Sequence, residues 1–78
     1  MKLGILITAY NEEPRIKKVL NKLTGKTIIL VNDGSTDGTE KIINNYDNII
    51  KISYKKNQGK GYALQRGLSY AKKNNLID

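Results

Sequence analysis

The chain has 78 residues with 14 basic and 7 acidic side chains, a net charge of +7, and neither cysteine nor histidine. This length allows one small domain, and the missing residue types exclude disulfides, a Cys/His zinc site, a cysteine nucleophile and a histidine base. The excess of positive charge indicates either an anionic partner, such as a nucleotide or a phospholipid surface, or only a solvated lysine-rich surface. Because the lysines form no run of five or more, we expect no nucleic-acid partner.

The first expected element is a strand over residues 2–9, whose continuous apolar run is typical of a parallel strand covered on both faces. The same run is too short to span a membrane and lacks a signal-peptide cleavage site. Together with the absence of cysteine, this favours a cytoplasmic location. A helix is expected next, with Asn11 as its N-cap and Pro14 in its first turn. Thr24-Gly25 is expected to end it.

The alternation of apolar strands and periodic helices continues along the chain. We expect a second strand over residues 26–32, a helix capped by Ser35 or Thr36, and a third strand over residues 48–54. The second helix is expected to present one apolar face, formed by Ile42, Ile43 and Tyr46. The third helix is expected to present a face of small and apolar residues, formed by Ala63, Leu64, Gly67, Leu68 and Ala71.

The resulting order of elements, β-α-β-α-β-α, predicts an α/β fold, a three-layer Rossmann-like parallel sheet with right-handed crossovers. We expect the strands in spatial order 3-2-1, with Leu76 and Ile77 as the start of a fourth strand. In such sheets ligands bind beyond the carboxyl ends of the strands. The loops 8–13, 32–39 and 57–61 should converge there.

These three loops are the segments richest in Asn, Asp, Gly and Thr, and their residues allow more than one interpretation. The first loop has no glycine, which excludes the phosphate-binding loop of a dinucleotide-binding domain. Its Tyr10 offers a flat face on which a base could stack, or packs against a neighbouring loop. Asp33 can accept from an imide N–H or a ribose hydroxyl, or is a turn aspartate, whereas Asp37 is interpreted as a helix-capping residue. Residues 59–61 form either an anion site at a helix N-terminus or an ordinary glycine-rich helix start.

Taken together, the loop sequences TAYNEE, VNDGSTDGT and NQGKGYALQRG resemble those of family 2 glycosyltransferases of GT-A fold. The likeness is to the branch of dolichyl- and polyprenyl-phosphate sugar transferases, and it runs from about Leu3 to Ala71. It implies that residues 1–78 are the N-terminal, nucleotide-sugar-binding part of a GT-A domain, which is incomplete. The implied activity is that of an inverting hexosyltransferase, which moves a sugar from a UDP- or GDP-sugar to an acceptor such as a polyprenyl phosphate or a glycan.

The resemblance also implies which residues bind the nucleotide. In this family the tyrosine of the first motif lies against the base, which maps to Tyr10. The aspartate of the second motif reads the base, usually uracil or guanine, which maps to Asp33. Thr8 and Ala9 supply backbone contacts beside the base, and Glu12 lies at the edge of the pocket. The nucleotide-binding residues expected in this chain are Thr8, Ala9, Tyr10, Glu12, Asp33, Gly59, Lys60 and Gly61.

The chain departs from the family in two catalytic features. The family's D-x-D motif, which helps to bind Mg²⁺ or Mn²⁺ and the donor diphosphate, follows the fourth strand, and the catalytic base comes later still. By spacing, Asp78 precedes that strand. We therefore expect Mg²⁺ or Mn²⁺ only in the full-length enzyme, and neither a metal ligand nor a catalytic residue in this chain. A lipid-phosphate acceptor would place the protein peripherally at the cytoplasmic face of a membrane. The alternative is a non-catalytic nucleotide-binding or structural α/β module.

Overall fold

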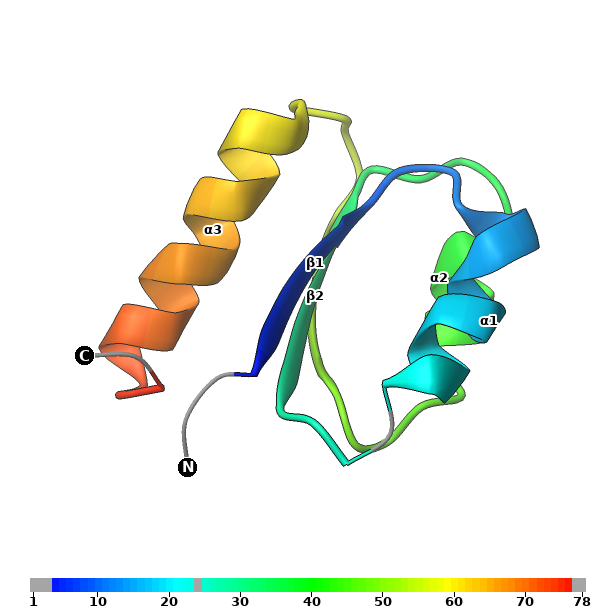
Figure 1. Cartoon of the computed structure of the whole chain (residues 1–78). Helices are drawn as coiled ribbons and strands as arrows, with labels where there is room; N and C mark the ends of the chain where they lie inside the picture. Colours follow the sequence, from blue (N-terminus) through cyan, green and yellow to red (C-terminus); the bar gives the residue numbers. More distant parts are fainter. Residues whose placement is uncertain (1–3, 24, 77–78) are drawn as a thin grey trace.

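The computed structural model describes residues 4–23 and 25–76, which fold as alternating strands and helices (Figure 1). In chain order the elements are β1 (Ile5–Ala9), α1 (Glu13–Lys22), β2 (Ile28–Asp33), α2 (Thr39–Ile43), β3 (Ile50–Tyr54) and α3 (Lys60–Lys73). The predicted order β-α-β-α-β-α is therefore confirmed.

The three strands form one parallel sheet with β2 in the middle, in the order β1-β2-β3. Ile7 of β1 pairs with Leu30 of β2, and Val31 of β2 pairs with Ile52 of β3. All six residues of β2 are buried, and an uninterrupted apolar run suits a strand whose two faces are both covered. The predicted parallel pairing and the predicted strand order are confirmed. Among the described residues, β1 has a neighbouring strand on one side only.

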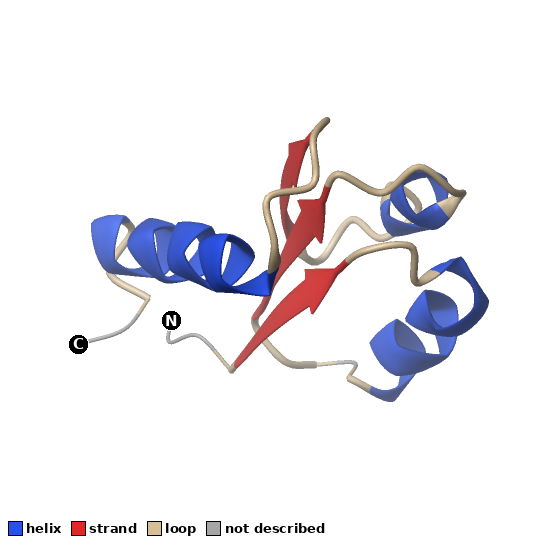
Figure 2. Ribbon diagram, turned by 90° about the horizontal axis from the view of Figure 1, so that it is seen from above, coloured by secondary structure: helices blue, strands red, loops and turns tan. Residues whose placement is uncertain are grey.

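Helices cover both faces of the sheet and give the fold three layers, with α1 and α2 on one face and α3 on the other (Figures 1 and 2). Because successive strand side chains point to opposite faces, β2 contributes to two cores. Leu30 packs in the core beneath α1 and α2, and Ile29 packs in the core beneath α3. On α1, Ile16 and Leu20 lie one turn apart and bury the inner face of the helix.

The inner face of α3 is made of small residues, which lets the helix lie close to the sheet. Ala63, Gly67 and Ala71 are buried at intervals of four residues. A Cβ atom on Gly67 would overlap the side chain of Leu6 on β1. The predicted inner face is therefore correct at these three positions. It is wrong at Leu68, which lies on the outer side of the helix with 45% of its surface exposed.

The strands differ from the prediction at their ends. β1 and β3 begin at Ile5 and Ile50, later than predicted, and residues 2 and 3 of the first predicted strand lie outside the described part of the chain. β2 begins two residues late and continues through Asp33, one residue further than predicted. As a result, Asp33, which was expected just after the second strand, is the last residue of β2.

The predicted N-cap of α1 is wrong. Glu12 occupies the N-cap position, whereas Asn11 takes up a left-handed backbone conformation with φ of 53°. The side chain of Asn11 is directed to the second loop, where its Oδ1 accepts a hydrogen bond of 2.8 Å from the N–H of Thr36. The helix ends at Lys22, before the predicted end at residues 24–25, of which residue 24 is not described.

The predicted caps of α2 are wrong as well. The helix begins at Thr39 behind Gly38, so neither Ser35 nor Thr36 lies at its start. Both hydroxyl groups bind the first loop instead. Ser35 Oγ accepts from the N–H of Asn11 at 3.0 Å, and Thr36 Oγ1 donates to Asn11 Oδ1 at 3.4 Å.

Tyr46 was predicted within the second helix and Leu76 within a fourth strand, but each lies in the segment that follows a helix. Tyr46 follows the end of α2 but still packs against the core beneath that helix. Leu76 lies in the turn after α3 rather than in a fourth strand, and its N–H donates to the carbonyl of Ala71 at 2.8 Å. Ile77, the other residue of that predicted strand, lies outside the described residues.

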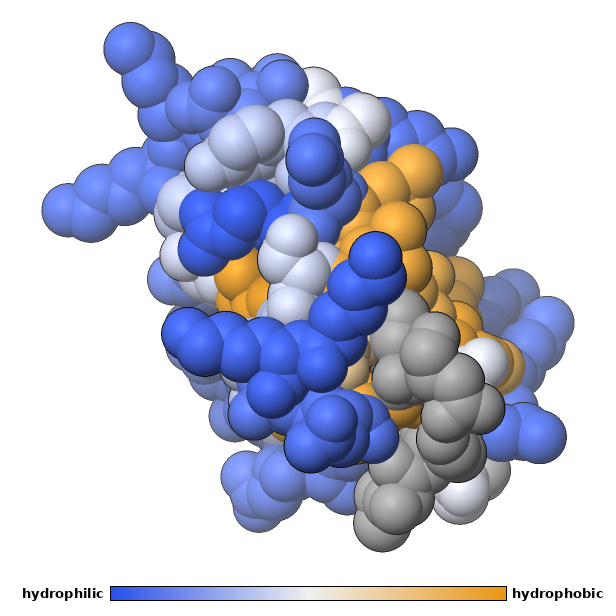
Figure 3. Space-filling model, turned by 90° about the vertical axis from the view of Figure 1, so that its left-hand side faces the viewer, coloured by the Kyte–Doolittle hydropathy of each residue, from blue (hydrophilic) through white to orange (hydrophobic). Residues whose placement is uncertain are grey.

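No helix in the described part of the chain combines the length and the apolar character needed to cross a bilayer. Figure 3 looks onto the α3 side of the molecule, where hydrophilic side chains cover most of the surface and a strip of apolar surface lies beside them.

Candidate functional site

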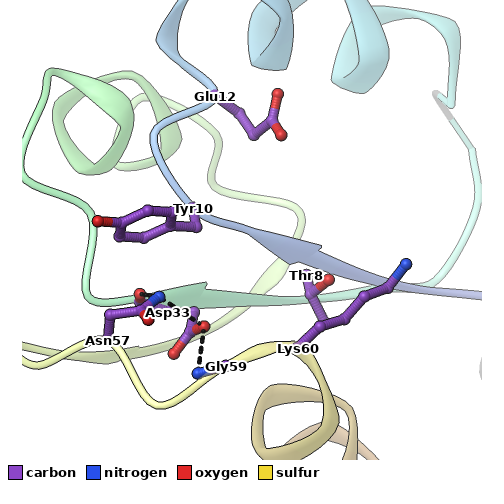
Figure 4. A pocket seen from close by; sticks show the side chains of 7 residues that line it. All are labelled: Thr8, Tyr10, Glu12, Asp33, Asn57, Gly59 and Lys60. Carbon is purple, nitrogen blue, oxygen red and sulfur yellow. Dashed lines mark hydrogen bonds between the residues drawn. The ribbon is translucent and has the colours of Figure 1, made fainter.

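A cavity of about 330 Å³ lies at the carboxyl edge of the sheet, where β1, β2 and the start of α3 meet (Figure 4). It is lined by Thr8, Tyr10, Glu12, Asp33, Asn57, Gly59 and Lys60. The lining comes from all three loops that follow the strands, although these loops are separated by about two dozen residues in the sequence. This is the edge at which parallel α/β sheets bind ligands.

The structure brings together most of the residues expected to bind a nucleotide. Six of the eight line the cavity: Thr8, Tyr10, Glu12, Asp33, Gly59 and Lys60. The other two are close in sequence but do not line it. Ala9 is buried at the end of β1, and Gly61 is the second residue of α3. Both can therefore offer main-chain groups at most, because neither carries a polar side chain.

The Tyr10 ring is available to a ligand. Its side chain follows directly on β1, and 47% of its surface is exposed. Figure 4 shows the ring lying flat above Asn57 and Asp33, on one side of the cavity. A ring held in this way at the mouth of a cavity can stack on a planar base.

Asp33 is buried and holds the third loop by its side chain, with 3% of its surface exposed. Its Oδ1 accepts the N–H of Gln58 at 2.8 Å. Its Oδ2 accepts the N–H of Gly59 at 3.0 Å and the side-chain Nδ2 of Asn57 at 2.9 Å. The burial of this carboxylate is thus compensated by three donors, as buried charge requires.

Gly34 allows this close approach of the second and third loops. It has a φ of 70°, a left-handed conformation that favours glycine. A Cβ atom at this position would lie 2.5 Å from the carbonyl carbon of Lys56 and 2.9 Å from Cα of Asn57. The two loops therefore touch through main-chain atoms at a point where no side chain fits.

The first and second loops are joined by reciprocal hydrogen bonds at the starts of α1 and α2. The N–H of Glu13 donates to Asp37 Oδ2 at 3.3 Å, and the N–H of Gly38 donates to Glu13 Oε1 at 2.8 Å. The N–H of Glu12 donates to the Thr39 hydroxyl at 2.9 Å. Main-chain donors at the starts of both helices are thereby satisfied from the neighbouring loop.

Asp37 lies before the N-cap residue Gly38 and not, as predicted, in the first turn of α2, but its carboxylate still binds the first residue of the helix. Its Oδ1 accepts the hydroxyl and the N–H of Thr39, the first residue of α2, the latter at 2.9 Å. The Thr39 hydroxyl, followed by the main-chain donors, lowers the pKa of Asp37. This carboxylate stabilises the loop and does not line the cavity.

The two charged side chains at the cavity rim are held differently. Glu12 accepts two hydrogen bonds from Arg15, at 2.9 Å from Nε and 2.6 Å from Nη2, so its charge is paired. Lys60 is exposed at the start of α3, and Figure 4 shows its side chain extending past Thr8, away from Asp33. Its ammonium group can reach an anion at the outer end of the cavity.

Asn57 is the lining residue that the sequence did not indicate. It follows two lysines after β3, and nothing in the local sequence distinguishes it from an ordinary loop asparagine. Its position depends on Asp33, 24 residues earlier, which binds its side-chain nitrogen. The only available signal was its place at the carboxyl end of a strand in a parallel sheet.

A cluster of two tyrosines and one arginine lies beside the cavity. The rings of Tyr54 and Tyr62 are 5.5 Å apart and nearly perpendicular, and the guanidinium of Arg66 lies 5.4 Å from the centre of the Tyr54 ring. The Tyr54 hydroxyl is buried and makes no hydrogen bond to any described residue. Its burial, together with the nearby Asp33 carboxylate, raises the pKa of Tyr54 to about 12.

This pKa predicts a loss of stability in strong alkali that depends on Tyr54. Because the folded pKa lies above the ordinary value of 10.0, the neutral hydroxyl stabilises the fold below pH 10, and that contribution is lost as the pH rises towards about 12. Tyr54→Phe should therefore weaken the decline of the unfolding free energy over this range, as measured by urea unfolding at several pH values. Tyr70→Phe, an exposed control, should keep the wild-type decline. If the unfolding free energy of Tyr54→Phe declines as steeply as that of the wild type, the loss of stability does not come from the raised pKa of Tyr54.

The described residues offer no set of side-chain ligands for a divalent metal ion. Over residues 4–23 and 25–76, no three side chains of the His, Cys, Asp and Glu types lie together in a way that could hold a metal ion. Of the carboxylates at the cavity, Asp33 is bound by the third loop and Glu12 by Arg15. The described residues therefore do not fit Mg²⁺ or Mn²⁺.

Comparisons with known proteins identify the family of the chain. The family model described as "Glycosyl transferase family 2" matches residues 4–77. Similar proteins include the dolichyl-phosphate beta-glucosyltransferase of Trichomonas vaginalis, which is 37% identical over 82 residues, covering 83% of this chain and 25% of that protein. An uncharacterized glycosyltransferase of Escherichia coli is 40% identical over 78 residues, covering 88% of this chain and 19% of that protein.

The name of a third relative states both a donor and an acceptor. The UDP-N-acetylglucosamine–dolichyl-phosphate N-acetylglucosaminyltransferase of Methanococcus voltae is 37% identical over 86 residues, covering 86% of this chain and 34% of that protein. The chain thus spans between about a fifth and about a third of the length of these three relatives.

Proposed function

Because the chain belongs to glycosyl transferase family 2, we propose that its cavity binds the nucleotide of a UDP- or GDP-sugar donor, for inverting transfer of the sugar to an acceptor. The single observation that carries this proposal is the exposed Tyr10 ring above a cavity whose floor is built from the second and third loops. A planar aromatic face next to hydrogen-bonding groups suits a nucleobase.

The size and charge of the cavity support the same ligand. About 330 Å³ lies at the low end of ligand pockets, enough for a base and ribose but small for a whole nucleotide-sugar. The main-chain groups at the start of α3 and the ammonium group of Lys60 lie at one side of the cavity, where a diphosphate could extend. We infer that this chain contributes the nucleoside part of a larger donor site.

The acceptor and the location are inferred from the relatives. Two of them are named for dolichyl phosphate, and one of these two is also named for UDP-N-acetylglucosamine. We propose a lipid phosphate, such as a polyprenyl phosphate, as the acceptor of the whole protein. The protein would then act peripherally at the cytoplasmic face of a membrane, and the net charge of +7 would favour an anionic lipid surface.

Transfer needs stabilisation of the departing nucleoside diphosphate, and a hydroxyl acceptor such as a glycan also needs a base, whereas a lipid phosphate is already ionised near pH 7. The chain has no histidine, and the cavity carboxylates are engaged by other residues of the chain. We infer that residues 1–78 bind and orient the donor nucleotide, that catalysis needs a further part of the enzyme, and that any Mg²⁺ or Mn²⁺ binds there. The non-catalytic binding module remains the alternative, since it shares the same cavity.

Nucleotide titration followed by NMR tests the proposed function. UDP and GDP should bind weakly, with a dissociation constant on the order of 1 mM, or about 4 kcal/mol, because the cavity holds only part of the donor. The amide signals that shift should be those of Tyr10, Asp33, Gln58 and Gly59. Shifts confined to the opposite edge of the sheet, around residues 25–28, would rule out the assigned cavity.

The contribution of Tyr10 can be isolated with a matched tyrosine. Tyr10→Ala should weaken UDP binding by about fivefold or more, because stacking of a base on an aromatic ring contributes about 1–3 kcal/mol. Tyr70→Ala removes an exposed tyrosine of α3, outside the cavity lining, and should leave the dissociation constant unchanged. Equal effects of the two substitutions would argue against stacking on Tyr10.

A further inference from the structure

The Asp33 carboxylate has little capacity left to bind a ligand. A carboxylate offers about four acceptor positions, and three of these are taken by donors of the third loop. The Tyr54 hydroxyl lies near enough for the Asp33 charge to raise its pKa. A nucleobase N–H could reach this carboxylate only by displacing one of the loop donors or by competing next to Tyr54.

The Asn57 side chain, in contrast, has an oxygen that accepts no hydrogen bond from the described residues. Its Nδ2 lies 3.0 Å from the main-chain oxygen of Asp33 and 2.9 Å from Asp33 Oδ2. Both neighbours are acceptors, so the atom that faces them must be the nitrogen and not the oxygen. Oδ1 therefore points elsewhere, and no donor in residues 4–23 or 25–76 reaches it. Asn57 lines the cavity, beneath the Tyr10 ring (Figure 4).

We propose that Asn57 presents the hydrogen-bond acceptor that reads the edge of the base, and that Asp33 is a positioning residue that fixes Asn57 and the third loop. This inference rests on the proposed function, because it assumes that a base stacks on Tyr10. Asp33 determines which way the Asn57 carboxamide faces and holds residues 58 and 59 by their main chain. The base contact itself is made by a neutral carbonyl.

The chemistry of this acceptor determines which bases fit. Uracil has a ring N–H at position 3, which can donate to the Asn57 carbonyl, whereas cytosine has a lone pair there. Two acceptors that face each other cannot form a hydrogen bond, which is why sites that hydrogen-bond a ligand discriminate against such analogues. The site should therefore prefer UDP over CDP, and the preference should depend on residue 57.

The positioning role of Asp33 is tested first without nucleotide, by hydrogen exchange of the Gln58 and Gly59 amides. Asp33→Asn replaces one acceptor oxygen by a donor, so exchange at one or both amides should rise by about tenfold or more, since hydrogen bonds to a charged group are among the stronger ones. Asn57→Ala should leave both amides protected, because their bonds to Asp33 remain. Unchanged exchange in Asp33→Asn would overturn the positioning role.

The reading role of Asn57 is tested by titrating UDP and CDP into the same variants. Asn57→Ala should weaken UDP binding by about two- to tenfold and bring the UDP and CDP dissociation constants within about twofold of each other. Gln65→Ala is the matched control, because Gln65 carries an exposed carboxamide on α3 and does not line the cavity. It should keep both the protection of Gly59 and the preference for UDP.

The outcomes separate this inference from the proposed function. If Asp33→Asn removes the UDP preference while its loop stays protected, and Asn57→Ala keeps the preference, then Asp33 reads the base and the inference is wrong. If the wild-type chain binds no nucleotide at all, the proposed function fails and the reading role of Asn57 fails with it. The exchange measurement would still decide whether Asp33 positions the loop.

Discussion

Gly34→Ala should destabilise the fold by about 3 kcal/mol or more, a large part of the roughly 4–12 kcal/mol expected for a chain of this size. Gly34 has a φ of 70°, and a Cβ atom there would lie 2.5 Å from the carbonyl carbon of Lys56. That atom belongs to the main chain and cannot rotate aside. The third loop must therefore move away from Asp33, and its hydrogen bonds to the carboxylate are lost with it.

Gly25→Ala provides the control for this prediction. Gly25 also has a left-handed conformation, with φ of 84°, but a Cβ atom there meets no atom of another described residue within 4 Å. Its substitution should cost only the backbone strain, about 1–2 kcal/mol. Urea unfolding followed by circular dichroism compares the two variants with the wild type. If both lose the same free energy, the contact between the second and third loops contributes nothing, and the argument for Gly34 is wrong.

The 78-residue chain alone should transfer no measurable sugar. The described residues offer no ligand set for a metal ion at the departing diphosphate, where such an ion contributes several kcal/mol of stabilisation. Asp33 and Asp37 cannot supply that set, because hydrogen bonds from the third loop and from Thr39 hold their carboxylates. The assay incubates the chain with labelled UDP-glucose, UDP-N-acetylglucosamine or GDP-mannose, polyprenyl phosphate and Mn²⁺, and measures label in the lipid fraction.

The same assay needs a positive control and a variant. The longer Methanococcus voltae relative, whose name states its donor and acceptor, shows whether the conditions support transfer. Transfer by the 78-residue chain that disappears in Asp33→Ala would show that the chain carries the catalytic groups after all. Nucleotide binding without transfer is the expected result.

The sequence predicted the sheet well because its signals are local. The continuous apolar run of β2 indicated a strand buried on both faces, and all six of its residues are buried. Small residues four apart likewise predicted the inner face of α3 at Ala63, Gly67 and Ala71. Leu68 was placed wrongly, since an apolar residue near the edge of a helical face can lie on either side of it.

The helix starts and the hydrogen-bonding partners at the cavity could not be predicted in this way. Asn11, Ser35 and Thr36 all suit an N-cap by residue type, but each binds another loop about 24 residues away. The link between Asp33 and Asn57 also spans 24 residues. Which of two chemically suitable partners a polar side chain takes depends on how close the loops come, and that distance is set by Gly34 rather than by the polar residues themselves.

The one-sided pairing of β1 has a consequence for the behaviour of the chain in concentrated solution. Among the described residues β1 pairs only with β2, and such an edge exposes a row of main-chain donors and acceptors, which can pair with the same edge of another copy and lead to aggregation. Each copy carries a charge of +7, so two copies repel each other at low ionic strength. That repulsion reaches about 30 Å at 0.01 M salt but only about 8 Å at 0.15 M. The colloidal stability of the chain is therefore linked to salt concentration by its surface charge, independently of how firmly its core is packed.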